Sequence, residues 1–178
     1  MKRESRTSGY PGLSQGVCYF FVHALVEIVC FTILSGYFSV SGGLLWGAAL
    51  LFDFFAFVIQ GPIGDLNRRF KTLDIGSIGA ALMLVGVLTI TGSADALSIL
   101  GLVLLALGNA FLHVSGAVST TVLSGGRLLH SALFVAGGSF GVVTGQFLGG
   151  ALHLSRFWLI LPLAAVEVLV LLTNRRWL

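Results

Sequence analysis

Apolar residues are gathered into six long stretches, separated by short polar or glycine-containing segments. A helix needs about 20 residues to cross a bilayer, and each stretch is close to that length. The stretches run over residues 16–38, 43–60, 73–91, 97–122, 131–152 and 157–173. None alternates like a barrel strand, and lipid requires backbone polar groups to be satisfied within each segment. We therefore predict an all-α integral membrane protein with six transmembrane helices.

The composition narrows the class further. The 178 residues are 56% hydrophobic and only 10% charged, with a mean hydropathy of +0.99. Soluble domains carry about 25% charged residues, so an ordinary water-exposed surface is excluded. The spans leave a single membrane domain over residues 1–178 and no soluble domain. Two cysteines exclude a disulfide scaffold, and ten scattered basic residues exclude a nucleic-acid-binding face. We expect no cofactor.

The basic residues predict an orientation in the membrane. Positive charge accumulates in cytoplasmic loops. Arg156 alone lies on one side of the predicted helices, and nine basic residues lie on the other. These nine are Lys2, Arg3, Arg6, Arg68, Arg69, Lys71, Arg127, Arg175 and Arg176. Both termini are therefore predicted to be cytoplasmic, in a multi-pass protein of the plasma membrane or the bacterial inner membrane.

Four ionisable side chains lie within predicted helices, namely Glu27, Asp53, His113 and Glu167. A charged group at this depth costs about 2.5–3.5 kcal/mol on an insertion scale, so each should face protein or a water-filled cavity. His23 precedes Glu27 by one helical turn, and Asn109 precedes His113 in the same way. Residues four apart share a helix face, so each pair presents two polar groups together.

These polar groups have two interpretations. In the structural one, they hydrogen-bond between helices and hold the bundle together. In the functional one, they bind a substrate or a proton, because a carboxyl group in apolar surroundings holds a proton readily and histidine titrates near neutrality. The candidate binding residues are His23, Glu27, Asp53, Asn109 and His113. Their spacings match no metal-binding signature, so no metal site is predicted.

The fifth stretch carries glycines on one helical face. They are Gly137, Gly141, Gly145 and Gly149. Small residues at this spacing let two helices approach closely, so we predict a packing surface, which also suits sliding in a moving protein.

An internal repetition has an offset of 86 residues. It maps His23 onto Asn109, Glu27 onto His113 and Gln60 onto Gln146. With three helices per repeat, two repeats (about 16–91 and 97–173) would face opposite ways across the bilayer. Inverted repeats are common in secondary transporters, with the substrate near the midplane.

The segment after the second stretch resembles a signature of the major facilitator superfamily, Gly-x-x-x-Asp-Arg-x-Gly-Arg-Arg. It reads Gly61-Pro62-Ile63-Gly64-Asp65-Leu66-Asn67-Arg68-Arg69-Phe70-Lys71. The fifth stretch is similar to the fifth-helix pattern of that family, Gly-x-x-x-Gly-Pro-x-x-Gly-Gly. It reads Gly141-x-x-x-Gly145-Gln146-x-x-Gly149-Gly150, with Gln146 in place of the proline.

Members of this superfamily have two six-helix halves, each a 3+3 inverted repeat. The resemblance implies one half of that fold, which a parallel homodimer would complete. It also implies transport of a small solute by alternating access, with proton coupling expected at Glu27. In the implied dimer, the glycines of the fifth stretch and Gln146 would face the partner's second helix. A cytoplasmic gate would be formed by Gly61, Gly64, Asp65, Arg68 and Arg69.

Other functions remain as alternatives. A non-transporting scaffold, or an accessory subunit that pairs with another six-helix chain, would have the same composition. A channel would need a continuous polar stripe, whereas these polar residues cluster near the midplane. An intramembrane serine protease would need a Ser–His pair, and the sixth stretch offers no histidine to Ser139. We expect no enzymatic activity, while substrate and direction of transport stay open.

Overall fold

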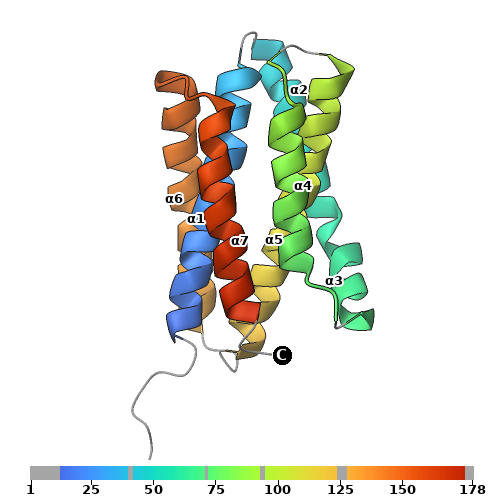
Figure 1. Ribbon diagram of the computed structural model, residues 1–178, viewed down its shortest axis with the longest axis vertical. Helices are drawn as coiled ribbons and strands as arrows, with labels where there is room; N and C mark the ends of the chain where they lie inside the picture. The colour runs from blue at the N-terminus through green and yellow to red at the C-terminus, as the bar shows by residue number, and fades with distance from the viewer. Residues whose placement is uncertain (1–12, 40–41, 71, 93–94, 124–127, 175–178) are drawn as a thin grey trace, which may run out of the picture.

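A computed structural model describes residues 13–39, 42–70, 72–92, 95–123 and 128–174. Every regular element in these ranges is helical. The positive-inside prediction falls largely on residues outside the described ranges, namely Lys2, Arg3, Arg6, Lys71, Arg127, Arg175 and Arg176. Within them, α3 ends at the same end of the bundle as the start of α1 and the end of α7, and Arg156 begins a 3₁₀ turn at the opposite end (Figure 1).

The helices follow the predicted stretches closely. They are α1 (Leu13–Tyr37), α2 (Gly42–Asp53), α3 (Gln60–Arg69), α4 (Ile75–Thr89), α5 (Ala96–Leu123), α6 (Leu128–Gln146) and α7 (Ile160–Asn174). A π-helical turn, Phe54–Val58, joins α2 to α3, and a second, Phe147–Ala151, extends α6. The 3₁₀ turn Arg156–Leu159 leads into α7. Among the described residues, five helical segments are long and apolar enough to cross a membrane.

The third predicted span is shorter than expected. The helix α4 has 15 residues rather than the full 73–91 stretch. It covers about 22 Å at 1.5 Å per residue, less than the hydrocarbon thickness of about 30 Å. Asp74 fixes its start, because the Asp74 Oδ1 atom accepts a hydrogen bond from the Ser77 backbone N–H at 3.1 Å. The chain then leaves the helix near Gly92, whose φ of +91° suits glycine.

The prediction of a loop from residue 61 onward is wrong. The second span continues as α3 to Arg69, so the motif from Gly61 to Arg69 is helical. Pro62 does not interrupt it, since proline is tolerated in the first turn of a helix, where its missing N–H has no helical partner. The Ile63 N–H bonds to Ile59 O at 3.1 Å across the junction with the π turn. Only the short segment from Phe70 to Asp74 connects α3 to α4.

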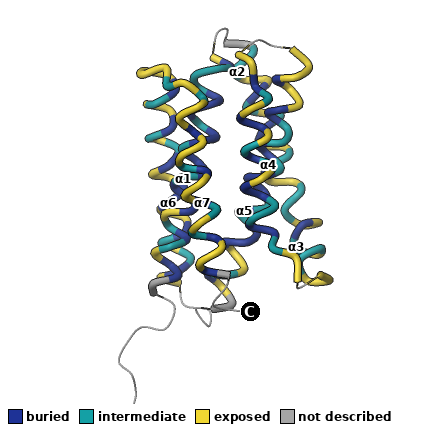
Figure 2. Tube along the Cα trace, viewed as in Figure 1, coloured by how far each residue is buried: buried dark blue, intermediate teal, exposed yellow. Residues whose placement is uncertain are grey.

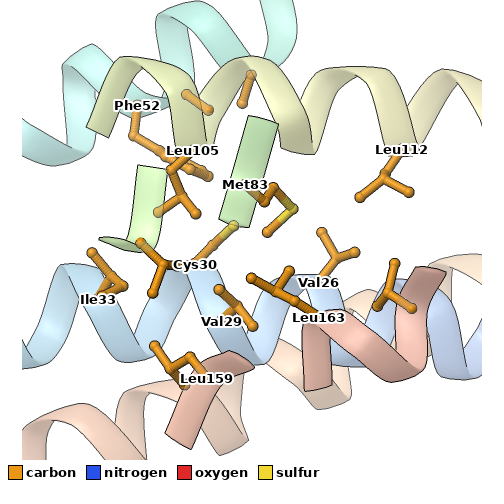
Figure 3. Packing of buried hydrophobic residues seen from close by; sticks show 14 of the residues in the cluster. Val26, Val29, Cys30, Ile33, Phe52, Met83, Leu105, Leu112, Leu159 and Leu163 are labelled. Carbon is orange, nitrogen blue, oxygen red and sulfur yellow. The ribbon is translucent and has the colours of Figure 1, made fainter. Parts of the chain in front are cut away.

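The helices form two groups that meet at α1 and α5. The helices α6 and α7 pack against α1, and α4 packs against α5 together with the α2–α3 segment (Figure 1). Buried positions lie mostly on the facing sides of these groups, with exposed positions on the outside (Figure 2). The core between them includes Val26, Cys30, Phe52, Met83, Leu105 and Leu163 (Figure 3).

Glycine pairs bring α4 and α5 together. A Cβ atom on Gly108 would lie 2.5 Å from Gly79 O, and one on Gly86 would lie 2.7 Å from Gly101 O. Real Cβ atoms do not approach backbone this closely, so only glycine allows this packing distance. These glycines were not predicted as a packing surface, although the two on α4 are seven residues apart and so are the two on α5.

The glycine stripe of α6 faces α1 of the same chain. A Cβ atom would lie 2.2 Å from Phe20 O at Gly137, 2.4 Å from Ala24 O at Gly141 and 2.7 Å from Ile28 O at Gly145. At Gly149 it would lie 2.3 Å from Thr32 O. The expectation that this stripe receives a partner chain is therefore corrected, because α1 already occupies the face. Gln146 is exposed at the end of α6.

Candidate functional site

Four of the predicted polar residues meet where α1 and α5 cross the middle of the bundle. His23 and Glu27 come from α1, and Asn109 and His113 come from α5. The side chains of His23, Glu27 and His113 are only 10%, 7% and 14% exposed. Asn109 is buried as well, with 1% of its surface exposed. Two pairs that are 86 residues apart in the sequence therefore form one polar cluster.

The Glu27 carboxylate is the centre of this cluster. Its Oε1 atom accepts a hydrogen bond from Asn109 Nδ2 at 2.9 Å and lies 2.9 Å from His113 Nε2. The same oxygen lies 3.5 Å from His23 Nε2, which is longer than an ordinary hydrogen bond. Asn109 Nδ2 also lies 3.5 Å from Cys30 Sγ. The Asn109 Oδ1 atom is buried without a hydrogen-bond partner among the described residues.

Residues of α6 hold the His23 ring. Its Nδ1 atom lies 2.7 Å from Phe134 O, so it donates its proton to that carbonyl. The ring stacks on Phe134 with centroids 4.3 Å apart and contacts the His113 ring edge to face at 4.5 Å. A Cβ atom at Gly138 would lie 2.5 Å from His23 Nε2, so glycine there makes room for the ring. His23 Nε2 is thereby fixed toward Glu27.

Gln60 holds the second histidine and was missed as a site residue. Its Nε2 atom lies 3.3 Å from His113 Nδ1 and donates to Ala56 O at 2.8 Å. The π turn before α3 places Gln60 beside α5 at this level. The available signal in the sequence was a polar amide at the end of an apolar stretch.

A pocket of about 270 Å³ lies against the cluster. Its wall includes Asp53 and Phe57 from the second span and Val135 and Ser139 from α6, and these four residues are exposed. Among the described residues that line it, two are carboxylates, Glu27 and Asp53, and none is lysine or arginine. The pocket therefore favours a cation over an anion. Asp53 thus joins the other four candidate residues at one site.

The predicted gate residues lie apart from this pocket. Gly61, Asp65 and Arg69 line a separate, open pocket on the surface of α3. Asp65 Oδ1 lies 3.2 Å from Arg68 Nη2, in an exposed salt bridge. A Cβ atom at Gly61 or Gly64 would meet nothing within 4 Å in one chain. Within the described chain these residues form an open surface rather than a contact.

Glu167 also lies apart from the cluster. It lines a separate apolar pocket between α4 and α7, together with Ser77 and Leu163. Its Oε2 atom is buried without a hydrogen-bond partner among the described residues.

Comparison with known proteins identifies no relative. The chain matches no family model, no curated protein and no solved structure. The likeness to the major facilitator superfamily thus rests on the sequence motifs. What the helices establish is the coarser class, a helical protein built to be embedded in a membrane.

Proposed function

We propose that the chain is one half of a secondary transporter, in which two parallel copies alternate access to the cluster around Glu27. The observation that carries this proposal is that the cluster opens onto a pocket. A purely structural clamp would bury its polar groups between helices, as Asn109 is buried. Here Asp53 and Ser139 are exposed on the pocket wall beside Glu27. Intramembrane ionisable groups that face a cavity typically mark a substrate or ion path.

The arrangement of the helices supports an inverted repeat. Glu27 and His113 are equivalent positions under the 86-residue offset, and their side chains are in contact at 2.9 Å. Equivalent residues in two repeats meet only close to the axis that relates them. The packing is also paired, because α1 contacts α6 and α7 while α5 contacts the second span and α4. Substrate sites of transporters with inverted repeats lie at such a repeat interface.

A second copy would cover the open side of the pocket. In a single chain, the carboxylates of Glu27 and Asp53 face a pocket whose wall also carries the exposed apolar residues Phe57 and Val135. Acidic groups at this depth are costly against lipid. Two chains with their pockets face to face would give twelve helices around a shared central cavity. A two-fold interface uses the same patch on both copies, so a single kind of chain can form both halves of the transporter.

The cytoplasmic gate and the proton coupling expected from the sequence are further parts of this proposal. Cytoplasmic termini would place α3 and its Asp65–Arg68 pair on the cytoplasmic side, where the pair can act in closing the cavity. Proton coupling through His23 and Glu27 stays a prediction. With Glu27→Gln, we expect that transport no longer depends on an imposed pH gradient while the dimer remains intact.

Alternating access can be tested without knowing the solute. Ser139 is exposed on the pocket wall, so a Ser139→Cys variant in a background without Cys18 and Cys30 places one thiol in the cavity. Right-side-out and inside-out vesicles would be treated with a membrane-impermeant maleimide. We expect labelling from both sides, because each conformation exposes the cavity to one of them.

The control is Val85→Cys in the same background, since Val85 is exposed on α4 and would face lipid. We expect no labelling of this position from either side. Labelling of Ser139→Cys from one side only, or from neither, would contradict alternating access and favour a non-transporting scaffold.

A further inference from the structure

The geometry points to a divalent transition-metal cation as the ligand of the cluster, bound by His23 Nε2, Glu27 Oε1 and His113 Nε2. One ligand atom from each of the three residues lies within 4.8 Å of the other two, and the residues come from two helices. The sequence spacing gave no metal signature, because the third ligand arrives from α5 rather than from the same helix. Binding of this cation does not depend on the proposed transport function. Its identity as the transported solute does rest on that proposal.

The two separations from Glu27 Oε1 fit a metal ion better than an organic ammonium group. Ligands in a tetrahedral site lie about 3.3–3.4 Å apart, given bonds of about 2.0–2.1 Å. An ammonium group that donates hydrogen bonds of about 2.9 Å would spread its acceptors to about 4.7 Å. Glu27 Oε1 lies 2.9 Å from His113 Nε2 and 3.5 Å from His23 Nε2. The 3.5 Å separation is close to the metal value. The 2.9 Å separation is a hydrogen bond in the present structure and would lengthen by about 0.4 Å when both atoms bind a metal. Both separations are shorter than the ammonium value.

The surroundings of His23 have the form expected around a metal ligand. A metal-bound histidine usually donates its other ring N–H to a carbonyl or carboxylate, which fixes the tautomer and the orientation of the ring. The His23 Nδ1 atom is 2.7 Å from Phe134 O, so its proton is on Nδ1 and the lone pair of a neutral ring is on Nε2. With Nε2 unprotonated, that lone pair faces the Glu27 carboxylate at 3.5 Å, and a cation bound by both atoms would remove the repulsion between them.

His113 requires one rearrangement. In this structure its Nε2 atom donates to Glu27, while Gln60 Nε2 approaches Nδ1 at 3.3 Å. Binding through Nε2 moves the ring proton to Nδ1. Gln60 must then turn its amide so that Oε1 accepts this proton in place of the present contact. Gln60 is therefore the outer partner of His113, as Phe134 O is for His23.

Charge and donor type select the class of cation. Glu27 and Asp53 bring two negative charges to the pocket, and its described lining contains no lysine or arginine to balance them. A divalent ion compensates both. Two imidazoles and one carboxylate suit Zn²⁺, Fe²⁺, Co²⁺, Ni²⁺ or Cu²⁺, whereas Mg²⁺ and Ca²⁺ prefer oxygen ligands alone. The pocket leaves a further coordination position to water.

The test is a Co²⁺ titration of the purified full chain in detergent after treatment with a chelator, followed by the visible absorption of the bound ion. We expect one Co²⁺ per chain, displaced by Zn²⁺ and retained in millimolar Mg²⁺ or Ca²⁺. His23→Gln, His113→Gln and Glu27→Gln should each weaken binding at least tenfold. The matched control is His153→Gln, since His153 is an exposed histidine outside the pocket.

Circular dichroism and gel filtration check that each variant folds. If Glu27→Gln does not fold, the two histidine variants provide the test. Absence of saturable Co²⁺ binding, or equal binding by the site variants and the wild type, would overturn the metal site. The vesicle labelling of Ser139→Cys is read separately. One-sided labelling with intact Co²⁺ binding would contradict the transporter proposal and leave the metal site standing. Labelling from both sides without Co²⁺ binding would contradict the metal site alone.

Discussion

Glu27 and His113 stand 86 residues apart in the chain, and the Glu27 Oε1 and His113 Nε2 atoms lie 2.9 Å apart. This contact joins α1 to α5 in the middle of the bundle. It places a carboxylate and an imidazole where a pocket reaches them, with His23 and Asn109 on the same oxygen. The proposed site therefore belongs to the packing of two helices rather than to either helix alone.

Gly138→Ala should damage the site with little effect on the bundle. A Cβ atom there would lie 2.3 Å from His23 Cε1, so the imidazole must turn away from Glu27. The clash is with a side chain that can move, so the helices stay in place. We expect at least tenfold weaker Co²⁺ binding with a nearly unchanged unfolding temperature.

Gly150→Ala is the matched control for this prediction. It lies on the extension of the same helix, and its Cβ atom would meet Ser35 Cβ at an ordinary 3.8 Å. Co²⁺ affinity should be that of the wild type. Unchanged affinity in Gly138→Ala would mean that the position of the His23 ring does not matter to binding.

Gly108→Ala should destabilise the fold itself. Its Cβ atom would lie 2.5 Å from Gly79 O, a backbone atom that moves only if α4 and α5 separate. Overpacking of this kind costs about 1–3 kcal/mol. The measurement is thermal unfolding in detergent, where we expect a clear decrease in the transition temperature.

Gly47→Ala provides the comparison, because a Cβ atom there meets nothing within 4 Å. Replacing a helical glycine by alanine in open space stabilises by about 0.5–1 kcal/mol. Equal unfolding temperatures for Gly108→Ala and Gly47→Ala would contradict the close contact of α4 with α5.

Gly61→Leu should weaken association of two chains without destabilising one. A Cβ atom at Gly61 meets nothing within 4 Å of its own chain, so this position on α3 is open to a partner in the proposed dimer. We expect the mass in detergent to shift from two chains toward one, while the protomer unfolds at the wild-type temperature.

Ala165→Leu, at an exposed position on α7, controls for added bulk and should leave the dimer unchanged. A wild-type mass of one chain, or a Gly61→Leu variant that remains dimeric, would argue against an interface at α3.

The apolar stretches predicted helix positions well because a membrane leaves the backbone few choices. The first, fourth, fifth and sixth stretches agree with α1, α5, the extended α6 and α7 to within a few residues. The errors fall at element ends. Polar residues after Gln60 indicated a loop, yet a helix also continues through polar sequence, and Pro62 is harmless in its first turn. The length of α4 depended on a cap at Asp74 that hydropathy does not report.

The sequence by itself determined the membrane class, the helical content and the polar residues on each helix face, because these follow from local composition and from the period of the helix. Only the tertiary structure decided which faces meet. It directed the glycine stripe to α1 rather than to a partner, since backbone carbonyls of α1 fill that space. It also brought Gln60 to His113 and both histidines to Glu27, because the positions of side chains from separate helices depend on how those helices pack.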